Sequence, residues 1–206
     1  MGRTWEVPTP RGPARLALDP AAGPARGLLV LGHGAGGDVD APDLVAVRER
    51  AVAAGLTVVR MTQPYRVAGR RAPAPAAHLD EAWTAAVAAL RADGAVAAGL
   101  PLLVGGRSSG ARVACRTAAA LDAAAVVALA FPLHPPGRPE RSRAAELASG
   151  VPTVVVNGDR DAFGVPSASP GVEVFVRPGE GHDLRRDPAT TATVVVDWLR
   201  AHGFAG

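Results

Sequence analysis

The stretch LLVGGRSSGARVA, residues 102–114, runs from an apolar segment through a glycine-flanked serine pair into a helical pattern. Gly106, Ser108 and Gly110 fit the pattern G-x-S-x-G at the junction of a predicted strand and a predicted helix. Such a turn is so tight that the residues two positions before and after the serine must be small. It lifts the serine Oγ above the sheet and directs the next backbone N–H toward the same space. The stretch predicts an α/β scaffold with a reactive serine at position 108, the alternative being a tight turn without chemistry.

Apolar runs alternate with helical patterns along the chain from Gly27 onward. The near-continuous Val and Leu content of the apolar runs is typical of strands buried on both faces. Repeated alternation favours a mostly parallel sheet with helices on both faces, and two short segments near the N-terminus can add an antiparallel hairpin at one edge. The predicted strands are 27–31, 57–61, 102–105, 125–130, 153–157 and 172–176, the predicted helices are 43–54, 78–92, 109–120, 143–148 and 190–201, and the predicted hairpin is 4–7 with 14–18.

Composition restricts both the domain organisation and the function classes. Of the 206 residues, 48% are hydrophobic, which suffices for one domain with a sizeable core, and no polar linker divides residues 1–206. All 22 basic residues are arginines, spread among 19 acidic residues to give a formal net charge of +3. Because there is no aromatic and basic stripe, nucleic-acid binding is not expected. The absence of lysine excludes a Walker A phosphate loop and a Schiff-base lysine.

Cys115 is the only cysteine, which excludes an intramolecular disulfide and a cysteine zinc cluster. The first twenty residues lack the apolar core of a secretory signal, and the longest apolar run, residues 123–131, is too short to span a bilayer. His78 beside Asp80 and Glu81 is only a weak metal signal. We therefore expect a soluble cytoplasmic protein without membrane contact, metal or cofactor, and the sequence leaves its oligomeric state open.

Two further candidates follow the serine, first an acid and then a histidine. VPTVVVNGDRDAFG, residues 151–164, is an apolar run that ends in Asp159 and Asp161. VEVFVRPGEGHDL, residues 172–184, is the next run and ends in the glycine-flanked His182. A carboxylate after the first run would orient an imidazole after the second. Asp161 is preferred because it lies further past the strand end, and Asp159 can instead cap the local turn.

The glycine-rich stretch LLVLGHGAGG, residues 28–37, allows two interpretations. The spacing of its glycines matches G-x-G-x-x-G, the phosphate-binding pattern of dinucleotide folds. Its HGAG tetrapeptide matches a turn that offers a backbone N–H to an oxyanion. A dinucleotide-binding helix should begin inside the glycine loop, but here the residues DVDA intervene and Pro42 is a better first helical residue. The oxyanion interpretation is favoured, with an NADP-binding protein that uses Arg60 as the lesser alternative.

Together these motifs resemble one family. The stretches GLLVLGHGAGG, GGRSSGARVA, FPLHPPGRPE, NGDRDAFG and GEGHDL, spread over nearly the whole chain, are similar to the small α/β-hydrolases, in particular the dienelactone-hydrolase-like group. Within that group the chain looks closest to uncharacterised bacterial hydrolases similar to the hydrolase-like part of a chromatin acetyltransferase-complex subunit. The resemblance implies an α/β-hydrolase fold, a triad of Ser108, Asp161 and His182, and an oxyanion hole formed by the N–H groups of Ala35 and Ser109. Serine in place of cysteine at the elbow departs from dienelactone hydrolases proper, so their substrate is not carried over.

The expected function is hydrolysis of a small ester or thioester through an acyl-enzyme. Only about twenty residues separate the predicted strands 125–130 and 153–157, too few for a substantial lid domain, so the site is expected to be open. His134, Tyr65 and Arg66 follow strands and are candidates for contact with a small-molecule acyl substrate, each with a structural or solvated role as the alternative. The rival function is a non-catalytic interaction module that retains the hydrolase shell.

Overall fold

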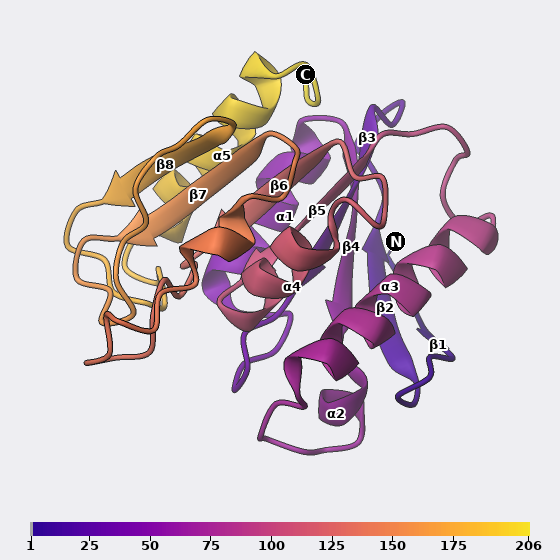
Figure 1. Cartoon of the computed structure of the whole chain (residues 1–206). Helices are drawn as coiled ribbons and strands as arrows, with labels where there is room; N and C mark the ends of the chain where they lie inside the picture. Colours follow the sequence, from indigo (N-terminus) through magenta and orange to yellow (C-terminus); the bar gives the residue numbers. More distant parts are fainter. Residues whose placement is uncertain (1) are drawn as a thin grey trace.

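The computed structural model describes residues 2–206 and is built around one eight-stranded sheet (Figure 1). The sheet order is β1-β2-β4-β3-β5-β6-β7-β8, in which β3 to β8 run parallel and β1 and β2 form an antiparallel hairpin at one edge. Parallel strands bring their carboxyl ends, and the loops that follow them, to one edge of the sheet. The strands are β1 (Arg3–Val7), β2 (Ala14–Asp19), β3 (Gly27–Gly32), β4 (Leu56–Thr62), β5 (Leu102–Arg107), β6 (Ala125–Leu129), β7 (Thr153–Gly158) and β8 (Val172–Arg177).

Helices cover both faces of the sheet. The helices are α1 (Pro42–Ala53), α2 (Pro64–Val67), α3 (Ala76–Ala92), α4 (Ser109–Thr117) and α5 (Pro188–Ala201), with a 3₁₀ helix, η1 (Ala144–Leu147). On one face α3 and α4 bury side chains such as Trp83 and Val113 against the strands. On the other face α1 and α5 pack on each other and bury Leu44 and Leu199. The apolar stripes recur every three or four residues, as in Leu79–Trp83–Val87, which explains why these segments form amphipathic helices.

The expected fold class is confirmed. Each of the six predicted strands and both arms of the hairpin are present, with ends that differ by at most two residues, and α1 begins at Pro42. The predicted helix 109–120 ends at Thr117, because the chain turns there and Asp122 adopts a positive φ before β6. The predicted helix 143–148 is a single 3₁₀ turn. The four-residue α2 was not predicted, since one turn is too short to show a periodic pattern.

The expectation that every strand is buried on both faces is wrong for β8. Phe175 and Val176 are 36% and 48% exposed. The reason is that β8 is the edge strand of the sheet, with β7 as its neighbouring strand, and helix α5 packs mainly on β7 and meets β8 through the hydrogen bond from Trp198 to Glu173. An apolar run at a sheet edge has the same sequence pattern as a central strand.

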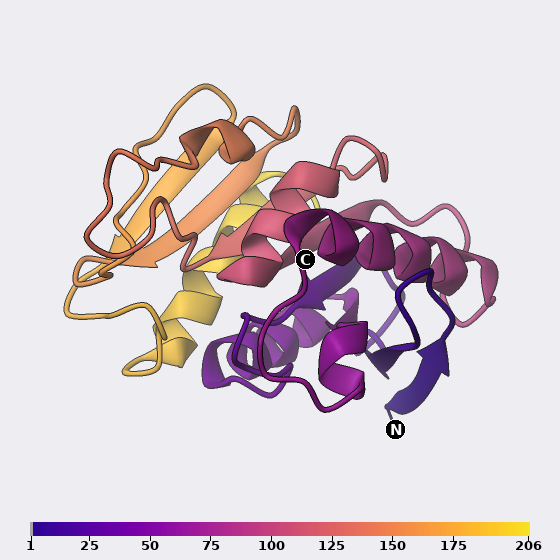
Figure 2. The same cartoon turned by 60° about the horizontal axis from the view of Figure 1, so that its bottom comes forward.

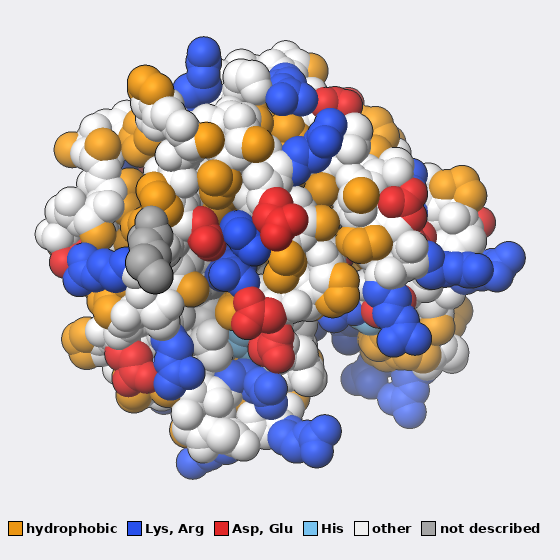
Figure 3. All heavy atoms as spheres, turned by 180° about the vertical axis from the view of Figure 1, so that it is seen from behind, with side chains coloured by type: hydrophobic (Ala, Val, Ile, Leu, Met, Phe, Trp, Pro, Cys, Tyr) orange, Lys and Arg blue, Asp and Glu red, His pale blue; other side chains and the backbone are white. Residues whose placement is uncertain are grey.

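The surface opposite to the view of Figure 1 mixes both signs of charge. Figure 3 shows this side, where α1 and α5 cover the sheet, with arginine and carboxylate side chains interspersed and no continuous basic stripe. Among the helices of residues 2–206, none combines the length and the apolar character that crossing a bilayer requires.

Candidate active site

The turn between β5 and α4 holds Ser108 in a conformation that few residues adopt. Ser108 has φ 52° and ψ −110°, and a non-glycine residue in such a region costs on the order of 1–3 kcal/mol. A Cβ atom on Gly106 or on Gly110 would overlap the carbonyl oxygen of Gly32 in β3, so only glycine fits at both positions. The Ser108 side chain makes no capping hydrogen bond to α4. The turn therefore leaves the Oγ atom free for other partners.

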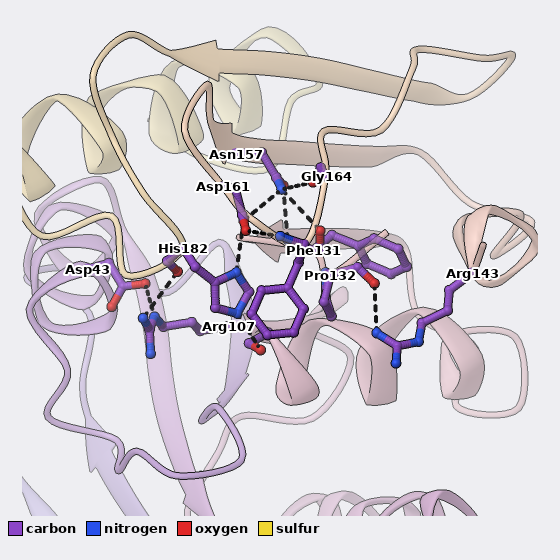
Figure 4. A network of polar contacts seen from close by, with 11 residues as sticks. Asp43, Arg107, Phe131, Pro132, Arg143, Asn157, Asp161, Gly164 and His182 are labelled. Carbon is purple, nitrogen blue, oxygen red and sulfur yellow. Dashed lines mark hydrogen bonds and ion pairs between the residues drawn. The ribbon is translucent and has the colours of Figure 1, made fainter. Parts of the chain in front are cut away.

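A chain of hydrogen bonds connects Ser108, His182 and Asp161 at the carboxyl edge of the sheet. His182 Nε2 lies 2.9 Å from Ser108 Oγ, and His182 Nδ1 lies 2.8 Å from Asp161 Oδ2 (Figure 4). Since a carboxylate accepts, Nδ1 carries the proton, and Nε2 accepts from the serine hydroxyl. Asp159 lies elsewhere, where its Oδ1 accepts the Gly179 N–H at 2.7 Å. Of the two aspartates, the structure brings Asp161 to the histidine.

Asn157, at the end of β7, holds the loop that carries Asp161. Its fully buried amide donates to Asp161 Oδ2 at 3.3 Å and to the Phe131 carbonyl at 3.0 Å, and accepts the Phe131 N–H at 2.9 Å (Figure 4). The other carboxylate oxygen accepts the Phe163 N–H at 2.8 Å. The Phe163 ring stacks on the imidazole of His182, with centroids 4.1 Å apart. Because both oxygens are held, the carboxylate cannot rotate away from the histidine.

The loop that carries His182 is anchored on both sides of the imidazole. Glu180 is 1% exposed, and its carboxylate accepts the N–H groups of Arg186 at 3.2 Å and Asp187 at 2.6 Å. Leu184, on the other side, is fully buried in the core beneath α1 and α5. The position of the imidazole is therefore fixed by a packed loop rather than by its hydrogen bonds alone.

Arg107, the residue before the serine, connects three segments of the site (Figure 4). Its Nη2 donates to the His182 carbonyl oxygen at 3.2 Å, and its Nε lies 3.0 Å from Oδ2 of Asp43 in the first turn of α1. Its Nη1 lies against Gly34, 3.4 Å from where a Cβ would stand. Asp43 is fully buried and no well-directed hydrogen bond reaches its oxygens. Burial therefore raises the pKa of the Asp43 carboxyl to about 6, although the nearby Arg107 acts in the opposite direction.

His33 orients the peptide group between Gly34 and Ala35. Its Nε2 accepts the Gln63 N–H at 3.1 Å, so Nδ1 carries the proton and donates to the Gly34 carbonyl at 2.8 Å. The Gly37 N–H donates to the same carbonyl at 3.2 Å. In a trans peptide the N–H points opposite to the C=O, so the Ala35 N–H is directed away from these anchors. Burial lowers the pKa of His33, which favours the neutral ring that this arrangement requires.

The two N–H groups predicted for an oxyanion hole have no acceptor among residues 2–206. None is found for Ala35, and Ser109 is the first residue of α4, where backbone N–H groups have no intrahelical partner. A Cβ on Gly34 would lie 3.5 Å from the Ser108 Cβ, which shows that the glycine loop lies directly against the serine turn. The site thus holds a hydroxyl, an imidazole that can take its proton, and two unpaired N–H groups nearby.

Tyr65 belongs to the glycine-loop side of the site. Its hydroxyl donates to the Ala35 carbonyl at 2.7 Å, and its side chain is 8% exposed. His134 lies on the opposite side, where its N–H donates to the Phe163 carbonyl at 3.0 Å and a Cβ on Gly164 would overlap its imidazole. In the described part of the chain His134 makes no hydrogen bond to Ser108 or to His182. Its contact with a substrate, like that of Tyr65, stays a prediction.

Arg66 and Arg60 lie beside the glycine loop in a region rich in carboxylates. Arg66 lines a hollow that also includes Asp38 and Arg60, and its contact with a substrate stays a prediction. Arg60, on which the NADP interpretation relied, forms ion pairs with Asp40 and, at 3.5 Å, with Asp19. The Arg60 charge is therefore already paired within the protein.

Comparison with known proteins assigns the family. Residues 25–186 match the profile of the alpha/beta hydrolase domain. The chain belongs to the α/β-hydrolase family. A comparison with curated protein sequences gave no significant match.

Solved structures similar to this α/β hydrolase share its fold at low sequence identity. XC6422 from Xanthomonas campestris, described as a serine hydrolase without a lid, has a TM-score of 0.77 at 19% identity over 98% of this chain and 94% of its own. An alpha-beta serine hydrolase homologue from Coxiella burnetii has a TM-score of 0.78 at 17% identity over 96% of this chain and 97% of its own. Est1E from Butyrivibrio proteoclasticus has a TM-score of 0.75 at 15% identity over 98% of each chain.

Several residues that build the site were not predicted from the sequence. His33 lies in the HGAG tetrapeptide and Arg107 lies between Gly106 and Ser108, so the sequence marked both positions but not the contacts that they make. Asn157 lies four residues before the predicted acid at a strand end, a position from which an amide can reach the same loop. Gln63 and Asp43 gave no signal, because their roles depend on contacts between segments far apart in the sequence.

Proposed function

We propose that this α/β hydrolase is a serine hydrolase that cleaves a small ester or thioester through an acyl-enzyme. The observation that carries the proposal is the chain of hydrogen bonds from Ser108 Oγ to His182 at 2.9 Å and on to Asp161 at 2.8 Å. Similar structures include proteins described as a serine hydrolase and as esterases, which supports the same reaction class. The positive φ of Ser108 and the buried Asp161 also support this function, because backbone strain and buried acids are common at active sites.

In the acylation step, His182 Nε2 takes the proton of Ser108 as Oγ forms a bond to the acyl carbon. The resulting oxyanion is stabilised by the backbone N–H groups of Ala35 and Ser109. Asp161 stabilises the imidazolium that forms. The bond from the acyl carbon to the alcohol or thiol then breaks, and the imidazolium gives its proton to the leaving group.

In the deacylation step, water replaces the departed alcohol or thiol. His182 takes a proton from the water as the water oxygen attacks the acyl carbon of the ester on Ser108. The oxyanion again faces the two N–H groups, the bond to Oγ breaks, and the imidazolium returns the proton to Oγ. The acid is released and the free enzyme is restored.

The connection between β6 and β7 favours small, soluble substrates. Residues 130–152 contain only the four-residue η1 between these strands, whereas a lid would need a larger insertion here. With no segment of that size to cover Ser108, an oil interface is not required to open the site. We expect activity on short, dissolved acyl esters, without interfacial activation on emulsified lipid.

A fluorophosphonate probe followed by intact-mass spectrometry tests the proposal. One adduct per chain, mapped to Ser108, is expected in the wild type and not in Ser108→Ala. Ser109→Ala is the matched control, since it removes the neighbouring hydroxyl but keeps the backbone N–H, and it should still be labelled. His182→Ala should be labelled far more slowly. A folded wild type that forms no adduct would favour the rival function, a non-catalytic interaction module.

A further inference from the structure

The loop that carries Asp161 also carries Phe163, whose ring lies on one face of the His182 imidazole. In Figure 2 the loops that follow β7 and β8 lie side by side, and the Arg160 N–H in the first donates to the Glu180 carbonyl in the second at 3.0 Å. The ring centroids of Phe163 and His182 are 4.1 Å apart, and their planes differ by 29°. The contact is stacked rather than edge-to-face, so the π face of Phe163 lies against the proposed base.

The backbone of Phe163 is held at both of its polar groups. Its N–H donates to Asp161 Oδ1 at 2.8 Å, and its carbonyl accepts the His134 N–H at 3.0 Å. The carbonyl of the next residue, Gly164, accepts from the Asn157 amide at 3.3 Å. One short turn therefore supplies both the acid on Nδ1 and the aromatic ring on the face of the imidazole. The bonds that hold the carboxylate in place also hold this ring in place.

The two hydrogen bonds of His182 leave one movement of its ring free. Nδ1 is bonded to Asp161 and Nε2 to Ser108, and the imidazole can still tilt about the line through these two partners without breaking either bond. The side chain of His182 is 24% exposed, so it is not enclosed on every side. The stacked ring of Phe163 opposes the tilt, because a tilt would open the contact and lose its dispersion energy.

This restraint matters most after the serine has been acylated. Before acylation the Ser108 hydroxyl donates to Nε2, but in the acyl-enzyme Oγ is an ester oxygen without a proton to donate. The imidazole then keeps the bond from Nδ1 to Asp161 and the stack on Phe163, while Nε2 has to face the attacking water. The centroid distance is also within the roughly 6 Å at which an aromatic face attracts a cation, so the ring favours the imidazolium that forms when the water gives up its proton.

We propose that Phe163 is a positioning residue for His182, whose ring keeps Nε2 directed at Ser108 and, in the acyl-enzyme, at the attacking water. The proposal rests on the proposed function, because it concerns the base of that same reaction. Of the two steps, deacylation depends more on the stack, since the serine hydroxyl no longer holds Nε2 there.

Phe163→Leu tests the role of the ring, because it removes the π face and keeps the backbone N–H that binds Asp161. The acetyl-enzyme is formed with p-nitrophenyl acetate, and the loss of the acetyl group from Ser108 is followed by intact mass. From the strength of a stacked aromatic pair, the rate of this loss should fall roughly two- to tenfold. The value of kcat/KM, which contains no deacylation step, should fall by a smaller factor.

Two further variants separate the ring from its surroundings. Phe163→Tyr keeps an aromatic ring and should retain the wild-type rate of acetyl loss. Phe175→Leu is the matched control, because it makes the same change at a partly exposed position of the edge strand β8, and it should leave both the rate of acetyl loss and kcat/KM unchanged. Phe163→Met, which also lacks a π face, takes the place of Phe163→Leu if that variant does not fold.

Proton NMR detects the stack itself. The ring current of Phe163 shifts the carbon-bound protons of the His182 imidazole to higher field. These resonances should therefore move to lower field in Phe163→Leu and stay close to their wild-type positions in Phe163→Tyr. A nuclear Overhauser effect between the two rings is expected in the wild type, and this measurement requires no variant.

The outcomes separate this inference from the proposed function. Acetylation of Ser108 with a rate of acetyl loss that is unchanged in Phe163→Leu, or that falls equally in Phe163→Tyr, would overturn the role of Phe163 alone. The absence of an Overhauser effect between the rings would do the same. A wild type that forms neither the fluorophosphonate adduct nor the acetyl-enzyme on Ser108 would overturn both.

Discussion

The two sides of Ser108 are built from different interactions. On the histidine side, ionisable groups are buried and paired, with Asp161 on His182 and Asp43 on Arg107. On the glycine-loop side, the Gly34 and Ala35 carbonyls are held by neutral hydrogen bonds from His33 and Tyr65. The difference matches the charges that the proposed reaction develops, an imidazolium on one side and an oxyanion on the other. A carboxylate stabilises the first, and N–H dipoles stabilise the second.

Buried polar atoms without hydrogen-bond partners occur on both sides. Every polar atom of Asn157 and Asp161 has a partner, but both carboxylate oxygens of Asp43 are buried without a directed hydrogen bond. On the other side, Gln63 Oε1 and Trp83 Nε1 are buried without partners, and both residues line a small hollow that Ser109 also borders. The acid beside His182 is thus preorganised by hydrogen bonds, whereas Asp43 is held by its ion pair with Arg107.

The largest effect is expected from removing the proposed nucleophile, Ser108, which lies between the two sides. Ser108→Ala should lower kcat for a short p-nitrophenyl ester by about 10⁶, as loss of a triad serine does. Steady-state kinetics on the purified variant measures this, with circular dichroism as the control for folding. A variant that retained a tenth of the wild-type kcat would exclude Ser108 as the nucleophile.

On the histidine side, Asp161→Asn should lower kcat by on the order of 10⁴. The amide would donate to Nδ1 where the carboxylate accepted from it, so Nε2 would carry the proton and could no longer accept the proton of Ser108. Asp159→Asn is the matched control, because Asp159 binds the Gly179 N–H and not the histidine. Equal losses in the two variants would contradict the assignment of Asp161.

The buried Asp43 should make stability depend on pH in a specific window. Burial raises its pKa in the folded protein from the ordinary 3.8 of an aspartate to about 6, so the native state binds this proton more tightly than the unfolded state. The stabilisation is fully present below about pH 3.8 and is lost as pH rises through 6. The unfolding free energy of the wild type minus that of Asp43→Asn should therefore fall by about 3 kcal/mol as the pH rises over that range. Urea unfolding at pH 3.5 and pH 7 measures it, and a difference that does not change with pH would contradict it.

Much of this account could be predicted from the sequence, and the rest depends on contacts that no local pattern encodes. Gly106 and Gly110 predict the serine turn because they belong to one contiguous pattern, although the atoms that exclude a side chain there belong to Gly32 of β3. Pro42 predicts the start of α1 because its fixed φ suits a first helical residue. The pairing of Arg107 with Asp43 joins β5 to α1, and nothing in either segment marks the other. The exposure of Phe175 could not be predicted, because an edge strand carries the same apolar run as a central one.

Arg107→Gln sharpens the comparison, because Arg107 contacts both sides of Ser108. It should lower kcat/KM by about 10–100-fold, since a small displacement of the His182 loop or of the Gly34 turn misaligns the reacting groups. Arg112→Gln is the matched control, an arginine of α4 whose partner is Glu146 rather than a residue of the site. Unchanged kcat with Arg107→Gln would show that the packed loops alone position the histidine.

The smallest effect is expected on the glycine-loop side. Tyr65→Phe removes one hydrogen bond to the Ala35 carbonyl and leaves the ring in place. A neutral hydrogen bond contributes about 0.5–1.5 kcal/mol, which corresponds to a fall in kcat of roughly two- to tenfold. A loss of several hundredfold would mean that Tyr65 acts on the substrate directly.

Capture of the acyl-enzyme tests the central claim most directly. Wild-type protein mixed with p-nitrophenyl acetate, quenched in acid within the first turnover and analysed by intact-mass and peptide mass spectrometry should carry one acetyl group, on the peptide that contains Ser108. Ser108→Ala treated in the same way should carry none. Turnover of the ester with no acetyl group on Ser108, or acetylation of another residue at the rate of turnover, would contradict the proposed mechanism.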